Sequence, residues 1–336
     1  MVSAGELLLE VRDLQAHFHL LEGTVRAVDG VSFDVSCGST VGIIGESGSG
    51  KSVMAQAILR IIPSPPGKIM GGKVLLHDLK PGIEPLDLTT LPPDGDVLRG
   101  IRGNSISMIF QEPMASFGPL TTIGSQISEA ILTHTPGCGK KEAMDRTVEL
   151  LARVGIPKPS QRKDSYPYQF SGGMLQRAMI AMALSCSPRL LIADEPTTAV
   201  DVTIQAQLME LLARLQEERH MAILLITHNL AVVSELAQHI VVMYLGRIVE
   251  RSTVQAIFES PLHPYTRALW RSIPKVEGEL TTLKSIQGTI PSPYETLTGC
   301  PFFNRCEERM VGKCDRVEPP TVEPQPGHWV SCLRYV

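Results

Sequence analysis

The stretch GESGSGKS, residues 45–52, constrains the fold of this chain more than any other part of the sequence. It satisfies the pattern G-x-x-x-x-G-K-[ST], follows the apolar run TVGIIG and precedes a helical stretch that begins near Lys51. Consecutive backbone N–H groups in such a loop cradle phosphates, and the helix N-terminus adds roughly half a positive charge. A glycine-rich turn that matches by accident is the alternative, and the strand before it and the helix after it argue against that alternative.

This loop therefore predicts a phosphate-binding site. Lys51 is expected to reach the β- and γ-phosphates of a nucleotide, and the Ser52 hydroxyl is expected to hold Mg²⁺. The other residues of the predicted site belong to the same loop and are Gly45, Ser47, Gly48, Ser49 and Gly50.

Apolar runs of strand length alternate with helical patterns, which predicts an α/β protein with a largely parallel sheet. The runs at 40–45, 190–194 and 222–227 are apolar on both faces, as buried parallel strands should be. Helical spacing is clearest at 203–219, and the Pro- and Gly-rich segment 81–96 is predicted to be a loop insertion.

Composition excludes several classes of protein. The net charge of −4 over 336 residues gives no reason to expect nucleic acid as a partner. We see no secretory signal and no apolar stretch near the ~18 residues that a membrane span requires, so the expected compartment is the cytosol. The last 76 residues hold ten of the 25 prolines and four of the seven cysteines, which places a predicted domain boundary near residue 260.

An acidic pair follows the second apolar run, in LLIADEP. Neighbouring side chains that leave a strand end point in different directions, so Asp194 can support the metal while Glu195 faces an attacking water. An acidic pair at a strand end is often only structural. In a chain that also has the phosphate-binding pattern at residues 45–52, called the P-loop below, the catalytic interpretation is favoured.

The motif FSGGMLQR at 170–177 resembles the ABC-transporter signature, usually written LSGGQ, in the Met-bearing form of oligopeptide and dipeptide importers. Further residues stand in the order that this family requires: Phe18 at the A-loop, Gln111 at the Q-loop, Asp201 at the D-loop and the switch histidine His228. A lone histidine or phenylalanine is more often structural, but the fixed order of all these elements outweighs that interpretation. The segment HPYTRAL and the cysteine-bearing tail also look like the C-terminal extension of peptide-importer ATPases.

The resemblance implies an ABC-type P-loop nucleotide-binding domain over residues 1–260, with a mixed sheet core and a helical subdomain at about 112–185. A small irregular C-terminal extension would follow over 261–336. Two signature positions depart from the family pattern: Met174 replaces the usual Gln, and Leu175 stands where relatives often have a polar or basic residue.

The resemblance also implies that two such cassettes close head-to-tail on two ATP molecules. Ser171 and the N–H groups of Gly172 and Gly173 would then meet the γ-phosphate held by the other cassette, because a helix start binds anions. ATP would favour the closed state, and hydrolysis would dissolve it.

Roles for the remaining matched residues follow from the same resemblance. Glu195 would polarise the water, and His228 would hold the γ-phosphate. Phe18 would stack on adenine, Gln111 would sense the metal and couple closure to the membrane subunits, and Asp201 would belong to the nucleotide site.

The implied function is energising an importer of di- or oligopeptides from the cytoplasmic face of the membrane. The implied partners are a second, homologous ATPase in a heterodimer, two transmembrane permease subunits and an extracytoplasmic substrate-binding protein. Nickel chelates or oligosaccharides are alternative cargoes. A soluble ABC ATPase of DNA repair or translation is a rival. Repair members carry a long insertion, for which the 59 residues between Gln111 and Ser171 leave no room. Translation members carry two cassettes, whereas this chain has one. A regulatory nucleotide binder is a second rival, although every residue needed for hydrolysis is present.

Four cysteines are concentrated in the tail: Cys300, Cys306, Cys314 and Cys332. Stable disulfides are rare in the cytosol, and a short Pro-rich segment has little apolar area to bury, so we predict one metal centre. Four thiolates suit Zn²⁺ or an iron–sulfur cluster. The intervals of five, seven and seventeen residues, together with the family resemblance, favour a [4Fe–4S] cluster over zinc. Four unrelated buried cysteines are the alternative.

Overall fold

The structure is a computed structural model, and it describes residues 6–77, 82–197, 201–272, 286–295 and 297–336. The chain forms two compact units that do not follow chain order. The first unit contains residues 1–9, 35–40 and 76–227, and the second contains residues 10–34, 41–75 and 228–336. The predicted boundary near residue 260 therefore falls inside the second unit.

The first unit contains a parallel sheet of three strands, β6 (Ile106–Ile109), β7 (Leu190–Asp194) and β8 (Ala222–Ile226). Every residue of these strands is buried, as the apolar runs at 190–194 and 222–227 predicted. The helix predicted at 203–219 is α8, which spans Val202–Arg219.

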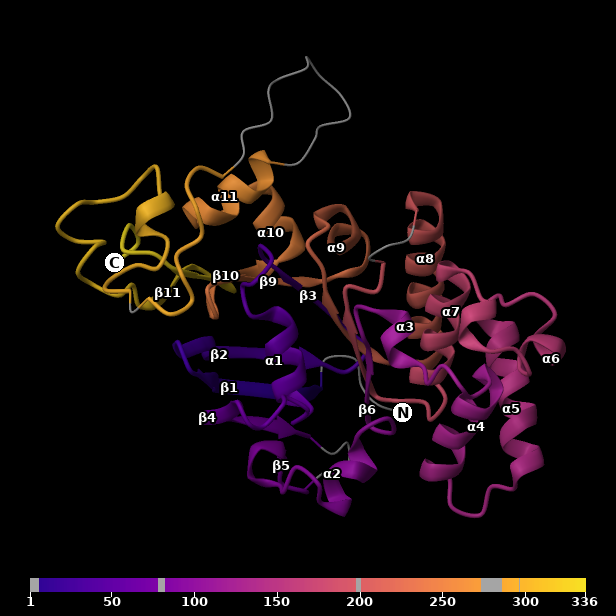
Figure 1. The fold of residues 1–336 in the computed structure, drawn as a ribbon. Helices are drawn as coiled ribbons and strands as arrows, with labels where there is room; N and C mark the ends of the chain where they lie inside the picture. The colour runs from indigo at the N-terminus through magenta and orange to yellow at the C-terminus, as the bar shows by residue number, and fades with distance from the viewer. Residues whose placement is uncertain (1–5, 78–81, 198–200, 273–285, 296) are drawn as a thin grey trace. The chain divides into compact units, whose positions relative to one another are not determined.

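Helices make up most of the remainder of the first unit, and α4, α5 and α7 pack on one another (Figure 1). They are accompanied by shorter helices, and α3 packs on α7 while α6 packs on α5. The helices and 3₁₀ helices of this unit, apart from α8, are η1 (Leu88–Thr90), α2 (Asp96–Ile101), α3 (Pro113–Ser116), α4 (Ile123–His134), α5 (Lys140–Arg153), α6 (Pro159–Arg162), η2 (Pro167–Gln169) and α7 (Gly172–Ala183).

The segment predicted to be a loop insertion, 81–96, is more structured than its composition indicated. Its described part contains the short strand β5 (Leu86–Asp87) and η1, and α2 begins at its last residue. The side chain of Asp87 accepts a hydrogen bond from the N–H of Thr89 and so caps η1. Leu88, the first residue of η1, is fully buried, and burial of this apolar side chain anchors the segment.

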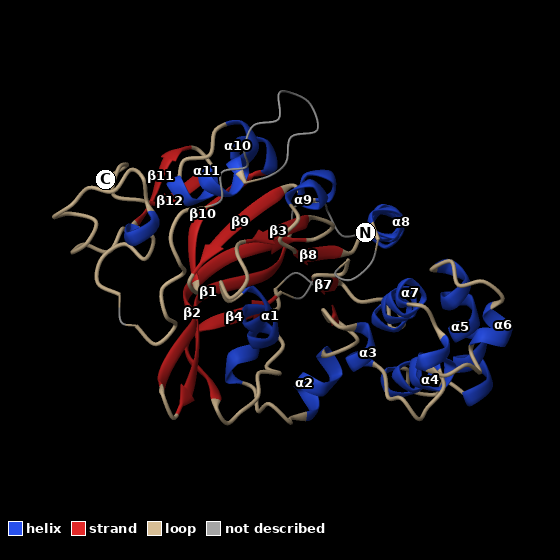
Figure 2. Cartoon of the chain, turned by 45° about the horizontal axis from the view of Figure 1, so that its top comes forward, coloured by secondary structure: helices blue, strands red, loops and turns tan. Residues whose placement is uncertain are grey.

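The second unit contains a mixed sheet (Figure 2). The fully buried strand β3 (Thr40–Ile44), predicted at 40–45, pairs in parallel with β9 (His239–Tyr244). Strand β9 pairs antiparallel with β10 (Arg247–Thr253), and β10 pairs antiparallel with β12 (His328–Ser331). Strand β11 (Thr321–Gln325) completes this arrangement beside β12, so the end of the chain adds two strands to the sheet that carries the P-loop.

Further elements complete the second unit. A neighbouring sheet has the order β2-β1-β4, and α10 packs on β9 and β10. The bounds of the remaining elements are β1 (Leu7–Leu20), β2 (Gly23–Ser36), β4 (Gly67–Leu76), α1 (Lys51–Ile58), α9 (Leu230–Leu236), α10 (Val254–Glu259), α11 (Pro264–Arg271) and η3 (Phe303–Arg305).

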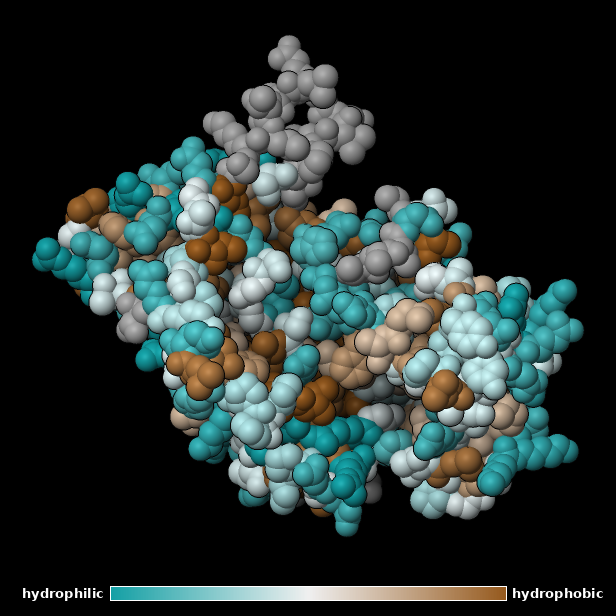
Figure 3. Space-filling view, viewed as in Figure 1, coloured by the Kyte–Doolittle hydropathy of each residue, from teal (hydrophilic) through white to brown (hydrophobic). Residues whose placement is uncertain are grey.

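No helix within the described residues is long and apolar enough to cross a bilayer. The face drawn in Figure 3 is largely hydrophilic, and its hydrophobic residues form scattered patches. Single exposed apolar residues of this kind are ordinary on protein surfaces.

Candidate functional site

The P-loop joins β3 to α1 with a backbone that only glycine adopts easily. Gly45, Gly48 and Gly50 have φ of 155°, 78° and 98°. A Cβ on Gly50 would lie 2.0 Å from the carbonyl oxygen of Ala27, and one on Gly45 would lie 2.3 Å from that of Met243. The two glycines are therefore required by close backbone approach as well as by the turn.

The Lys51 side chain is bound by oxygens of its own loop. Its Nζ donates hydrogen bonds to the carbonyl oxygens of Gly45 and Glu46, both at 2.9 Å, and to Oγ of Ser49 at 3.3 Å. Only 5% of the residue is exposed. These three bonds hold the ammonium group inside the loop, where a positive charge would favour an anion.

Glu46 belongs to the same loop and is bound by two side chains from far along the chain, which sequence reasoning missed. Arg305 forms a bidentate ion pair with the carboxylate of Glu46, and Tyr265 accepts a hydrogen bond from the backbone N–H of Glu46. Tyr265 lies in the segment HPYTRAL, which resembles part of the C-terminal extension of peptide-importer ATPases. That resemblance assigned no role to Tyr265. No pattern in the sequence marks Arg305.

The predicted catalytic pair lies at the end of β7. Asp194 is buried, with 3% exposure. Glu195 has φ of 49°, an uncommon conformation for a residue with a side chain, and its N–H donates to the carbonyl oxygen of Ile226 at 2.8 Å. Nε2 of Gln111 donates to Oε2 of Glu195 at 3.1 Å. The structure therefore brings together two residues that lie 84 positions apart in the sequence and that were both predicted to act in catalysis.

Helix starts carry two more predicted residues. Ser171 caps α7, and its Oγ accepts from the N–H of Met174 at 3.4 Å. Asp201 caps α8, and its Oδ1 accepts from the N–H of Ile204 at 2.9 Å. Leu175, which departs from the family pattern, is 2% exposed, so it is a packing residue of α7.

Gly172 and Gly173 form the first turn of α7 and differ in their surroundings. A Cβ on Gly172 would meet no atom within 4 Å, whereas one on Gly173 would lie 3.2 Å from Cγ2 of Ile204. The N-terminus of α7 therefore presents an open surface at Gly172.

The remaining nucleotide-site candidates lie in the second unit. Phe18 is half-buried on β1, and its ring lies against Gly67, where an added Cβ would be 2.9 Å from Cε1. His228 is exposed and follows β8 by two residues.

The four tail cysteines line one small cavity of about 20 Å³. Burial raises the pKa of the Cys300 and Cys306 thiols to about 11, and the neighbouring cysteines add to the rise. Burial also raises the pKa of Cys332. Among the residues that the structure describes, no three or more His, Cys, Asp or Glu side chains are arranged as a metal site.

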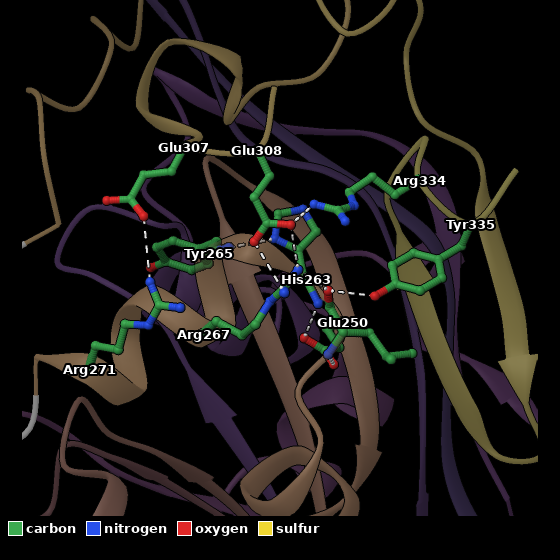
Figure 4. A network of polar contacts seen from close by, with 10 residues as sticks. Glu250, His263, Tyr265, Arg267, Arg271, Glu307, Glu308, Arg334 and Tyr335 are labelled. Atoms are coloured by element: carbon green, nitrogen blue, oxygen red, sulfur yellow. Dashed lines mark hydrogen bonds and ion pairs between the residues drawn. The ribbon is translucent and has the colours of Figure 1, made fainter. Parts of the chain in front are cut away.

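A buried carboxylate fastens the extension to β10 (Figure 4). Glu250 is 1% exposed and accepts hydrogen bonds from the N–H groups of Leu262 and His263, at 2.6 and 3.0 Å. Nε2 of His328 lies 2.7 Å from Oε1 of Glu250. Around it, Glu308 pairs with Arg267 and Arg334.

Comparison with known proteins gives consistent matches. The ABC transporter family matches residues 28–198, and the C-terminal region of oligopeptide/dipeptide transporters matches residues 249–314. The oligopeptide transport ATP-binding protein AppD of Bacillus subtilis is 48% identical over 328 residues, covering 98% of this chain and 97% of the relative. The dipeptide transport ATP-binding protein DppD of Haemophilus influenzae is 49% identical over 312 residues, covering 93% and 91%.

A solved structure is also similar. The dimeric, post-hydrolysis ATP-binding cassette MJ0796 bound to ADP and Pi has a TM-score of 0.64 and 26% identity, and the match covers 73% of this chain and 98% of that one. The expected α/β cassette fold is thereby confirmed.

Proposed function

Because the chain belongs to the ABC transporter family of ATPases, we propose that it is the ATP-hydrolysing subunit that energises a membrane importer of di- or oligopeptides. The observation that carries the substrate class is the match of residues 249–314 to the C-terminal region of oligopeptide/dipeptide transporters. We further propose that residues 1–260 act as the ATPase domain, with its helical subdomain at about 112–185, and that residues 261–336 form the extension.

The proposed chemistry is phosphoryl transfer to water, which is catalysed by positioning and by electrostatic stabilisation. The P-loop N–H groups and Lys51 bind the phosphates. Ser52 and Asp194 would hold Mg²⁺, which would supply positive charge to the phosphoryl group that is transferred. Glu195 accepts a proton from the attacking water, and Gln111 orients Glu195 through their hydrogen bond. Phe18 stacks on the adenine, and His228 contacts the γ-phosphate.

The functional unit is proposed to be a dimer of cassettes. Ser171, Gly172 and Gly173 bind the γ-phosphate held by the partner subunit, because the open start of α7 offers N–H groups to an anion. Asp201 belongs to the same dimer site. The partner is a second, homologous ATPase, and the pair works on two permease subunits supplied by an extracytoplasmic binding protein. The proposed assembly puts the chain at the cytoplasmic face of the membrane, and no nucleic-acid partner is proposed.

The tail is proposed to bind one [4Fe–4S] cluster through Cys300, Cys306, Cys314 and Cys332, with Zn²⁺ as the alternative. In support, all four thiols line the same cavity, and soft thiolate donors suit either centre. A bound cluster would cross-link segments that bury little apolar area. Ligation would bring the four thiolates, which line one cavity in the structure, onto a common centre.

Co-purification of the assembled transporter, followed by mass spectrometry of the cargo carried by its binding protein, tests the proposal. Short peptides in the binding protein and ATP-dependent uptake of those peptides into proteoliposomes would support it. Nickel chelates or oligosaccharides as the bound cargo would replace the peptide assignment. ATP hydrolysis by the purified chain that never couples to uptake by any permease would contradict the transport assignment.

A further inference from the structure

Glu46, the second residue of the P-loop, is bound from three directions. Nη1 and Nη2 of Arg305 lie 2.6 and 2.9 Å from the two carboxylate oxygens. The Glu46 N–H donates to Oη of Tyr265 at 2.8 Å, and its carbonyl oxygen accepts from Nζ of Lys51 at 2.9 Å. Two of these three partners come from the C-terminal extension, 219 and 259 positions away along the chain.

Arg305 is held in place by contacts other than Glu46. Its Nε donates to the carbonyl oxygen of Gln287 at 3.2 Å, and its guanidinium carbon lies 5.8 Å from the ring centre of Tyr244 and 6.0 Å from that of Phe302. Only 4% of the side chain is exposed. Two parallel charge-assisted bonds from a fixed guanidinium group hold a carboxylate in one orientation.

Burial and aromatic packing also restrict the Tyr265 side chain. It is fully buried on α11, where His263 caps the helix through Nδ1 and the N–H of Tyr265. Its ring packs against those of Tyr244 and Phe302, with ring centres 4.7 and 5.4 Å apart. Burial raises the pKa of the Tyr265 phenol, so it remains a neutral hydroxyl beside the loop. The helix that begins the extension thus presents a rigid acceptor to the P-loop backbone.

These contacts fix the two peptide groups on either side of Glu46. Tyr265 holds the N–H of the peptide before it, and Lys51 holds the C=O of the peptide after it. Once both peptides are fixed, the orientation of the following loop N–H groups is also restricted. A site whose donors are ordered before the ligand arrives binds more tightly, since less conformational entropy is lost on binding.

We propose that Arg305 and Tyr265 are positioning residues of the ATP site, through which the C-terminal extension holds the P-loop in its phosphate-binding conformation. The inference rests on the proposed role of the P-loop as the ATP phosphate site. It gives the extension a part in nucleotide binding.

The test measures the affinity of the full-length chain for a fluorescent ATP analogue with Mg²⁺. Arg305→Met removes both bonds and leaves the Glu46 carboxylate unpaired, so binding should weaken about fivefold or more. Tyr265→Phe removes one hydroxyl and should weaken it by about threefold. Arg271→Met is the matched control, because the Arg271 side chain is exposed and pairs with the exposed Glu307. The affinity of this variant should equal that of wild type.

A double-mutant cycle separates positioning from general destabilisation. Adding Glu46→Gln to Arg305→Met removes the unpaired charge, so the double variant should bind no more weakly than Arg305→Met alone. Additive losses would overturn the proposal, because they would indicate two independent effects. Affinities within about twofold of wild type for folded Arg305→Met and Tyr265→Phe would overturn it as well.

Two further outcomes are informative. If Arg305→Met fails to fold, Tyr265→Phe and Glu46→Gln decide the matter by the same criterion, since each keeps the size of its side chain. Lys51→Ala tests the proposed phosphate site itself. Retained binding in Lys51→Ala would contradict that site, whereas lost binding in Lys51→Ala with normal binding in the Arg305 and Tyr265 variants would contradict only the positioning role.

Discussion

Gln111 donates a hydrogen bond to the Glu195 carboxylate, with 3.1 Å between Nε2 and Oε2. One residue follows β6 and the other follows β7, and these strands are parallel neighbours. The carboxyl ends of parallel strands meet at one edge of a sheet, which is where ligand sites of α/β proteins form. The bond therefore fixes the carboxylate that is proposed to activate water.

Gln111→Ala should lower the turnover number for ATP about tenfold or more, because the Glu195 carboxylate loses the group that orients it. The affinity for ATP should change little, since the P-loop is untouched. Steady-state kinetics and an ATP-analogue titration separate the two quantities. Gln161→Ala, an exposed change on α6, is the control. Unchanged turnover in Gln111→Ala would rule out an orienting role.

Gly172→Ala should fold normally yet lose activity. A Cβ at this position meets no atom within 4 Å, and alanine favours a helix over glycine by about 1 kcal/mol, so the free energy of unfolding should stay the same or rise. In the proposed dimer the methyl group would block the approach of the partner's γ-phosphate, and ATP hydrolysis should fall about 10²-fold. Urea unfolding and ATPase assays measure both effects. Full activity would contradict the role of α7 in the dimer.

Anaerobically purified protein should be brown, with broad absorbance near ~400 nm and about four irons per chain. Cys300→Ser should lose iron, whereas Cys186→Ser, outside the tail, should retain it. Colourless protein with one equivalent of zinc would establish the zinc alternative. Protein without metal would leave the four cysteines as ordinary buried thiols.

The sequence predicted the parts of the site that depend on local pattern. The P-loop needs glycines at fixed spacing, and the strands β3, β7 and β8 need apolar residues on both faces, so both features are visible in short stretches. Ser171 and Asp201 are hydrogen-bonding residues of the type that starts helices, and both cap one.

The contacts missed by sequence reasoning join residues that are far apart along the chain. Arg305 reaches Glu46 because β12 of the extension pairs with β10 and because Phe302 and Tyr265 pack on Tyr244 of β9. No spacing rule encodes that packing. The segment 81–96 keeps its predicted loop character over most of its described residues, and its short regular elements lie at and beside Leu88, whose burial depends on tertiary structure. Tertiary packing often overrides local preference in this way.

ATP hydrolysis at this site is tested by Glu195→Gln, which replaces the proposed catalytic base. The substitution keeps the size of the side chain and removes the base, so turnover of Mg²⁺-ATP should fall by ~10²–10⁴ while binding of ATP persists. Hydrolysis by the assembled complex and analogue binding by the same variant should be measured side by side. A large loss of turnover with retained binding is the predicted result. Turnover within about threefold of wild type would contradict the assignment of Glu195 as the catalytic base.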